Sequence, residues 1–171
     1  IDIGSSSINV AVAESSSKGY AVLSVQDFPL SPDPRADRAL EIIDTLRKIA
    51  DQFDHSTTKF CIAIPQRQVS LRLQQFPFKE RQKIVKSLAF ELEDEIPLAA
   101  EDTIYDAKIV QFVGEGSEVL TCACPKEDIL NLLQVCKDGG FDPELVSVEG
   151  LALSNVFEKW QQQPPQTSAP P

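Results

Sequence analysis

Apolar and polar residues alternate along the first thirty positions, and this period of two predicts β-strands. Ile8, Val10 and Val12 alternate with smaller or polar neighbours. The serines after Gly4 and the stretch SSSKG at 15–19 are turn signals. The pattern therefore predicts three antiparallel strands, over residues 1–4, 8–13 and 20–28.

The period changes after a proline-broken loop at 29–37. Apolar residues recur at steps of three and four over 36–53, which predicts an amphipathic helix. The near-continuous apolar run KFCIAIP at 59–65 is typical of a strand covered on both faces. A helix that leads into such a strand predicts a mixed sheet with helices packed on it.

A second alternating segment begins at residue 69. Its pattern predicts that Val69, Leu71 and Leu73 face a core, while Arg72 and Gln74 face solvent. A helix over 77–97, two strands at 103–113 and 117–124, a helix that starts after Pro125 and a strand at 144–149 follow. Residues 69–148 thus have the order strand, helix, strand, strand, helix, strand of a ferredoxin-like subdomain.

The last predicted element is a helix that ends near residue 160. We expect its apolar residues to pack back on the first subdomain; these are Leu151, Leu153, Val156, Phe157 and Trp160. The segment 161–171 is rich in proline and glutamine and cannot build a core, so we expect a linker there. The fold class that follows is α/β, with α+β character in its second part.

Composition excludes several classes of partner. The chain has 171 residues with 42% hydrophobic and 25% charged, and its net charge is -10. This charge repels nucleic acid and anionic lipid, although it leaves a basic peptide open. No stretch approaches the ~20 apolar residues that span a membrane. Methionine is absent, so we expect the chain to begin inside a longer protein.

Side chains that often carry chemistry are few. The chain has four cysteines, which we expect to be buried and reduced, and one histidine, His55, so neither a zinc site nor a catalytic triad is predicted. The acidic run at 91–95 is interpreted as a solvated helix face or a docking surface rather than a metal site. The residues FPF at 76–78 are either core residues or the lining of a peptide groove. No catalytic residue is identified.

The opening hairpin is the candidate ligand site. Small residues and backbone amides in such a turn can bind phosphate, and a carboxylate beside them can hold a hydrated Mg²⁺. The alternative is a tight turn with no ligand. The candidate cofactor-binding residues are Asp2, Gly4, Ser5, Ser6, Ser7 and Asn9.

The sequence resembles two related families of bacterial assembly proteins. IDIGSSSINVAV is similar to the first phosphate motif of the actin-like superfamily. The segment IPQRQVSLRLQQFPFKERQKIVKSLAFELEDEIPLAAEDTIYDAKIV resembles the PilM family of type IV pilus assembly and the cytoplasmic domain of GspL in type II secretion. The positions that carry the second resemblance are Arg72, Phe76-Pro77-Phe78, Glu91-Leu92-Glu93, Ile96-Pro97 and Asp106.

This resemblance implies an actin-like (ribonuclease H-like) subdomain IA over 1–68 and 148–160, with an inserted 1C-type subdomain over 69–147. It covers the N-terminal half of an actin-like fold, so ATP and Mg²⁺ are expected only together with the second half, at most with weak ATPase activity. The family's first motif usually has a lysine where this chain has Asn9, which weakens attraction to a polyphosphate.

The resemblance also implies a role and partners. The protein is expected at the cytoplasmic face of the inner membrane, as a peripheral platform that binds a short cytoplasmic peptide of a PilN-like partner, or GspM- and GspE-like components. Self-association is left open. The alternatives are a fragment of a sugar or acetate kinase and a scaffold that binds no nucleotide.

Overall fold

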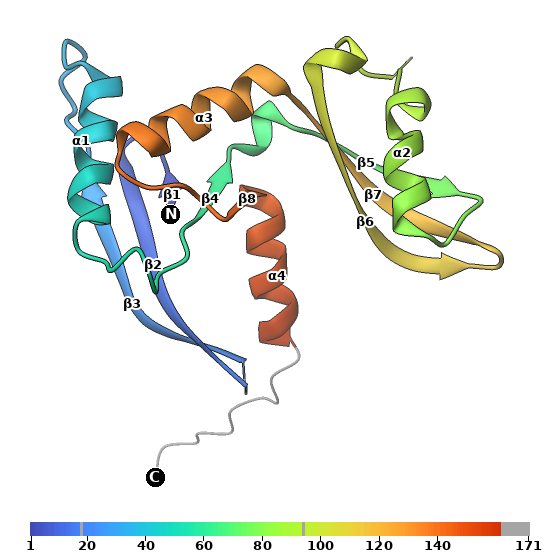
Figure 1. The fold of residues 1–171 in the computed structure, drawn as a ribbon, viewed down its shortest axis with the longest axis horizontal. Helices are drawn as coiled ribbons and strands as arrows, with labels where there is room; N and C mark the ends of the chain where they lie inside the picture. Colours follow the sequence, from blue (N-terminus) through green and yellow to red (C-terminus); the bar gives the residue numbers. More distant parts are fainter. Residues whose placement is uncertain (18, 94, 162–171) are drawn as a thin grey trace.

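Two β-sheets lie side by side in the computed structural model, each with helices packed on it (Figure 1). The structure describes residues 1–17, 19–93 and 95–161. The predicted linker therefore lies, after its first residue, outside the described part of the chain. The first sheet has five strands and the second has three.

The five-stranded sheet has the order β3-β2-β1-β4-β8 and mixes strand directions. β1 pairs antiparallel with β2 and parallel with β4, and β4 pairs parallel with β8. The predicted N-terminal meander and mixed sheet are confirmed, although β2 and β3 are longer than predicted. The strands are β1 (Asp2–Ile3), β2 (Ser7–Ser16), β3 (Gly19–Pro29), β4 (Cys61–Ile64) and β8 (Leu145–Val148).

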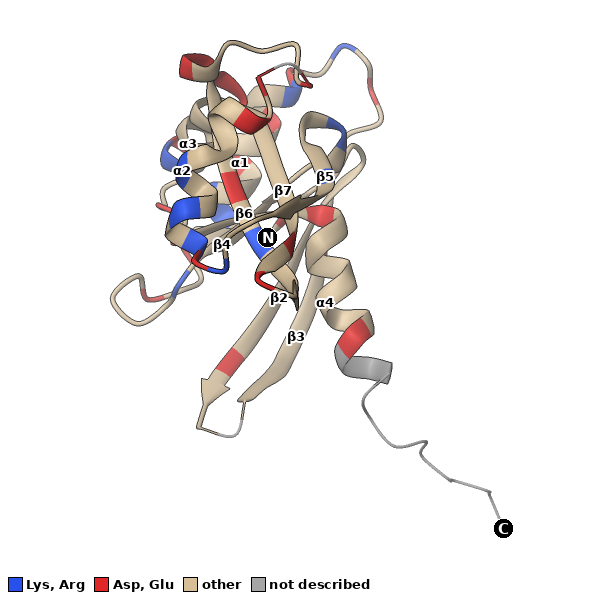
Figure 2. Ribbon diagram, turned by 90° about the vertical axis from the view of Figure 1, so that its right-hand side faces the viewer, with Lys and Arg blue, Asp and Glu red and all other residues tan. Residues whose placement is uncertain are grey.

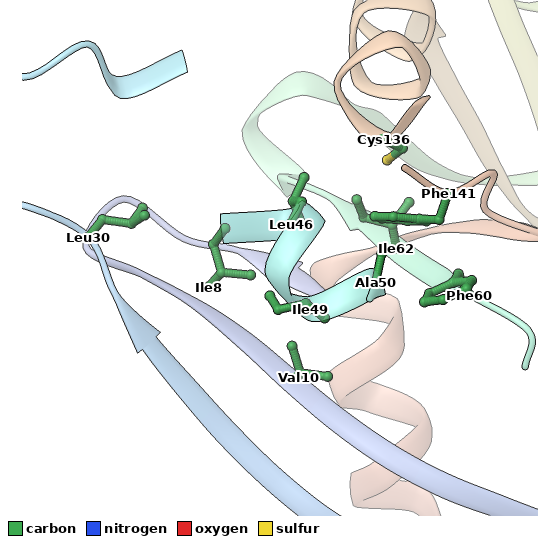
Figure 3. Packing of buried hydrophobic residues seen from close by; sticks show 10 residues of the cluster. All are labelled: Ile8, Val10, Leu30, Leu46, Ile49, Ala50, Phe60, Ile62, Cys136 and Phe141. Atoms are coloured by element: carbon green, nitrogen blue, oxygen red, sulfur yellow. The ribbon is translucent and has the colours of Figure 1, made fainter. Parts of the chain in front are cut away.

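The first helix, α1 (Arg38–Ala50), covers one face of this sheet. It begins at Asp37, whose side chain accepts a hydrogen bond from the Leu40 N–H at 3.1 Å. This is a favourable N-cap, because it satisfies an amide that has no partner within the helix. Figure 3 shows the buried side chains of α1 against those of β2. Each fully buried side chain of this kind contributes about 1.5–3 kcal/mol.

A second helix, α3 (Lys126–Asp138), packs beside α1 in the same core. Its Cys136 is fully buried in this cluster (Figure 3). Gly139 permits the close approach at its C-terminal end, since a Cβ there would lie 2.7 Å from the Leu46 Cβ. α3 therefore packs with the five-stranded sheet.

The ferredoxin-like arrangement predicted for 69–148 is wrong. Its last strand, β8, pairs with β4 and not with the second sheet, and its last helix, α3, packs on α1. The physical reason is burial, because Val146 and Val148 extend the apolar surface that begins at Ile62 and Ile64 of β4. The proposed boundaries of subdomains IA and 1C stay a prediction.

The three-stranded sheet is antiparallel, with the order β5-β7-β6. The helix α2 (Arg81–Glu91) covers one of its faces, with Ile84 and Leu88 fully buried against Phe76. The strands are β5 (Ser70–Phe76), β6 (Thr103–Val113) and β7 (Gly116–Pro125), and two short 3₁₀ turns lie at Gln66–Gln68 and Ala100–Asp102.

The predicted orientation of residues 69–74 is confirmed for Val69 and Leu71, which pack against a buried cluster, and is wrong for Leu73. Leu73 is 58% exposed, whereas the alternate face, which ends in Phe76, packs against the α2 side. Polar partners explain this arrangement: Arg72 donates to the Glu95 carbonyl at 2.9 Å, and Gln74 donates to the Glu95 carboxylate at 3.2 Å. Arg72 is thus held by Glu95 on the α2 side of the sheet, whereas the Gln74 Oε1 atom is buried with no hydrogen-bond partner among the described residues.

The last helix, α4 (Glu149–Gln161), follows β8 directly. Leu151 packs against Ile64 and Val148, as predicted. The expected packing of its other apolar residues is wrong for Leu153 and Val156, which are 64% and 65% exposed. None of the helices in the described ranges is long and apolar enough to cross a membrane.

Candidate functional site

The β1–β2 turn is held tightly by its own backbone. The Gly4 N–H donates to the Ser7 carbonyl at 2.9 Å, and a Cβ at Gly4 would lie 2.9 Å from that same oxygen. Glycine therefore fits this position with the least strain. Ser7 already belongs to β2, so Ser5 and Ser6 are the exposed serines of the turn.

The strand register brings two of the predicted site residues together. Asp2 is aligned with Asn9 across β1 and β2. The Asp2 Oδ1 atom is buried and has no hydrogen-bond partner among the described residues. An unsatisfied buried carboxylate oxygen is costly, and a hydrated cation would satisfy it. Asp2 thus fits the role of holding Mg²⁺ through water.

The same register places no cationic side chain across the sheet from Asp2. Asp2 on β1, Asn9 on β2 and Asp27 on β3 lie in one row across the sheet. Neither Asn9 nor Asp27 has a positively charged side chain. The groups at this turn that could contact an anion are the backbone and hydroxyl groups of Ser5 and Ser6.

Two further residues border this end of the sheet and were missed in the sequence. The parallel strands β1, β4 and β8 end together, and Gln66 and Glu149 follow β4 and β8. The Gln66 N–H donates to the Glu149 carboxylate at 3.3 Å, and the Gln66 side chain lies against Gly150. The sequence feature that could have identified them is their position directly after two parallel strands, because ligands often bind at the carboxyl ends of such strands.

A second candidate site is a groove with a volume of about 350 Å³ between the two sheets. Its floor is the open face of β6 and β7, which α2 does not cover. Its walls come from β8 and from the beginnings of α3 and α4. The lining side chains are mainly apolar: Ile64, Val69, Ile104, Leu120, Cys122, Cys124, Ile129, Val146, Val148 and Leu151.

The groove lies beside two sheet edges. β8 is the end strand of the five-stranded sheet and β6 is the end strand of the three-stranded sheet. The four residues Leu145–Val148 of β8 all line the groove in succession. Because side chains alternate between faces along a strand, four consecutive lining residues indicate that the strand's edge itself borders the groove. Its backbone groups are thus placed to pair with an extended chain.

Charges lie on the rim of the groove. Asp106 and Lys108 of β6 both line it, and both are exposed. Asp106 forms an ion pair with Arg81 of α2. The rim of the groove therefore carries one acidic and one basic side chain, of which the acidic one is held by α2.

Two cysteines contribute to the floor as neutral groups. Burial raises the pKa of the Cys122 and Cys124 thiols to about 11, and the nearby Asp106 carboxylate adds to the effect at Cys122. Such thiols are protonated at neutral pH and behave as apolar side chains. The expectation that all four cysteines are buried holds for Cys124 and Cys136, is partly met by Cys122 and is wrong for Cys61, which is exposed.

The FPF motif at 76–78 and the acidic run at 91–95 are the two remaining candidates from the sequence. Phe76 is buried and Phe78 is half-buried in the core under α2, so the core interpretation of the FPF motif is confirmed. A smaller open hollow of about 340 Å³ borders Pro77. In the acidic run, Glu95 binds Arg72 and Gln74, while Glu91 and Glu93 are exposed.

Comparison with known proteins places the chain in a family. A family model described as type IV pilus assembly protein PilM matches residues 1–170. The chain belongs to the PilM family. A search of proteins with curated functions finds no significant match.

Two solved structures share the fold of this PilM-family chain. The PilM-PilN type IV pilus biogenesis complex is 18% identical with a TM-score of 0.70, and the match covers 93% of this chain and 49% of that one. The cytoplasmic domain of EpsL, an inner membrane component of the Vibrio cholerae type II secretion system, is 14% identical with a TM-score of 0.53, over 86% and 54%. The chain thus spans about half the length of these structures.

Proposed function

We propose that this chain is part of an actin-like platform protein of a type IV pilus machine, and that its groove binds a short peptide of a PilN-like membrane partner. The observation that carries the proposal is the apolar groove along the β8 edge. Membership of the PilM family and likeness to a PilM-PilN complex support the partner. The protein then works at the cytoplasmic face of the inner membrane.

The groove suits an extended peptide for two physical reasons. Backbone groups at the β8 edge can hydrogen-bond to an added strand, which supplies affinity that depends little on sequence. Apolar side chains of that strand can then enter the floor formed by Ile104, Leu120 and Cys122, which supplies selectivity. A volume of about 350 Å³ accommodates a few side chains of this size.

The test is calorimetric titration of the full-length protein with a synthetic peptide that copies the cytoplasmic N-terminus of the PilN-like partner. Ile104→Glu places a charge in the groove floor, where Ile104 is 40% exposed. We expect the affinity to fall at least about tenfold, since a charge would be desolvated against an apolar ligand.

Leu73→Glu is the matched control. Leu73 lies on a strand of the same sheet, is 58% exposed and does not line the groove. We expect this variant to bind the peptide as the unmodified protein does. An equal loss of affinity in both variants would refute the groove as the site, and no binding by the unmodified protein would refute the peptide partner.

A nucleotide site at the β1–β2 hairpin is the second function that an observation favours. The unsatisfied Asp2 Oδ1 atom supports a hydrated Mg²⁺ there, and Gly4, Ser5 and Ser6 would approach the phosphates. Titration of ATP and Mg²⁺ into the full-length protein tests this. Binding that is abolished by Asp2→Asn supports the site, whereas no heat of binding favours a scaffold without nucleotide.

A further inference from the structure

One face of the five-stranded sheet is open along β2 and β3. Val10 and Val12 of β2 pack into the core beside α1. Side chains alternate between the two faces of a strand, so the neighbouring Ala11 and Ala13 point away from α1. Both alanines are exposed. The side of the β2–β3 ribbon opposite α1 is thus accessible to another segment.

Two valines of β3 form an apolar row on this open face. Val25 is aligned with Ala11 and Val22 with Ala13, and residues directly opposite each other on paired strands share a face. The register shifts between these two pairs, which leaves Leu23 as an extra residue in β3. The shift is the reason that two valines three positions apart point the same way. Val22 is 67% exposed and Val25 is 72% exposed.

The helix α4 is also largely uncovered. Leu151 packs in a core cluster, whereas every residue from 152 to 158 is exposed. Leu153 and Val156, which are 64% and 65% exposed, lie on the side of the helix opposite Leu151. A helix of 13 residues is only marginally stable without tertiary packing. This side of α4 therefore needs a partner.

The two apolar surfaces flank a floor of small side chains. Figure 2 shows α1 to the left of β2 and β3 and α4 to their right. β3 is the end strand of the sheet, and α4 contacts β4 and β8 toward its other end. Leu151 lines the groove beside the second sheet, and Figure 1 shows the β2–β3 ribbon on the other side of α4. Ala11 and Ala13 thus lie between the valines of β3 and the exposed side of α4.

We propose that a helix from the remaining half of the full-length protein packs on this open face. The two solved structures are about twice as long as the part that this chain matches, because the match covers 49% and 54% of their chains. The alanine floor lets a helix about 10 Å wide lie close to the sheet. Its apolar side then contacts β3 and α4, which completes a layer on each face of the sheet.

A segment of the same polypeptide is favoured over a second copy. Two chains of charge -10 repel each other, whereas a tethered segment has a high effective concentration at the face. The few apolar side chains on the two flanks are therefore sufficient to hold it.

A lysine placed on the open face of the full-length protein tests the proposal. The variants are Val25→Lys and Val156→Lys. Their matched controls are Val110→Lys on β6 and Leu130→Lys on α3, at positions 53% and 54% exposed and away from this face. We expect the first two to lower the melting temperature by about 5 °C or more, because the docked helix would bury the charge. Each control should change it by about 2 °C or less.

Hydrogen exchange on the same proteins identifies the occupant. We expect Val25→Lys to speed exchange of the amides at 152–158 at least about tenfold, because one docked helix protects both elements, and Val110→Lys to leave it unchanged. Val25→Thr gives the same comparison if Val25→Lys does not fold. Equal melting temperatures for the face variants and their controls would overturn the proposal. Protection of α4 that rises with protein concentration would also overturn it, since the occupant would then be a second copy.

Discussion

The orientation of β5 is open to a direct test by truncating one residue on each face. The alternation of the sequence buries Leu73 and exposes its neighbours, whereas the structure exposes Leu73 by 58% and buries Phe76 to 4% exposure. The perturbations are Leu73→Ala and Phe76→Ala, made separately. If Leu73 faced the core, Leu73→Ala would lower the free energy of unfolding more than Phe76→Ala. With Phe76 in the core, Phe76→Ala has the larger effect.

The magnitudes follow from burial. Phe76 lies in the core under α2, so its truncation removes buried surface and leaves a cavity, at a cost of about 3–5 kcal/mol. Leu→Ala at a fully buried site loses about 2.4 kcal/mol from transfer of three carbons alone. Less than half of Leu73 is buried, and water fills the space that the truncated side chain leaves. We therefore expect Leu73→Ala to lower the free energy of unfolding by ~1 kcal/mol or less.

Urea denaturation followed by far-UV circular dichroism measures both differences. Equal slopes of the unfolding free energy with urea concentration would show that both variants unfold by the same transition. A loss of 2 kcal/mol or more for Leu73→Ala, of the order expected at a buried leucine, would refute the orientation, as would a larger loss than for Phe76→Ala.

Two further results are expected. Arg72→Met should cost about 0.5–1.5 kcal/mol in urea denaturation because the hydrogen bond to the Glu95 carbonyl is lost; a loss no greater than that of exposed Arg67→Met would contradict the role of this bond. Cys61 should react quickly with a thiol reagent at pH 8, while the other three thiols react slowly until the protein is unfolded. The free energy of unfolding should fall as the pH rises from about 9 toward 11. The reason is that the thiols of the unfolded chain ionise before those of the folded protein, where the pKa values of Cys122, Cys124 and Cys136 are about 11. If all four thiols of the folded protein reacted equally fast, Cys122, Cys124 and Cys136 would not be shielded from solvent as the structure shows.

The candidate sites differ in how far the sequence predicts them. The β1–β2 hairpin is visible in the sequence because a tight turn demands small residues such as Gly4 in consecutive positions. The groove is not visible, because its lining comes from segments as distant as Ile64, Cys122 and Leu151. Nothing in the local pattern of any one of them indicates that the three lie together.

The local elements and the family can be inferred from the amino-acid sequence alone. Periodicity predicted α1 and the three N-terminal strands, because repeated burial of one face leaves a regular pattern. Tertiary structure decided which sheet receives β8 and which face of β5 is covered. Both depend on partners far along the chain: β8 extends the apolar surface of β4, and the Arg72 and Gln74 side chains donate hydrogen bonds to Glu95. A short segment records its own period but not the identity of the surface that covers it.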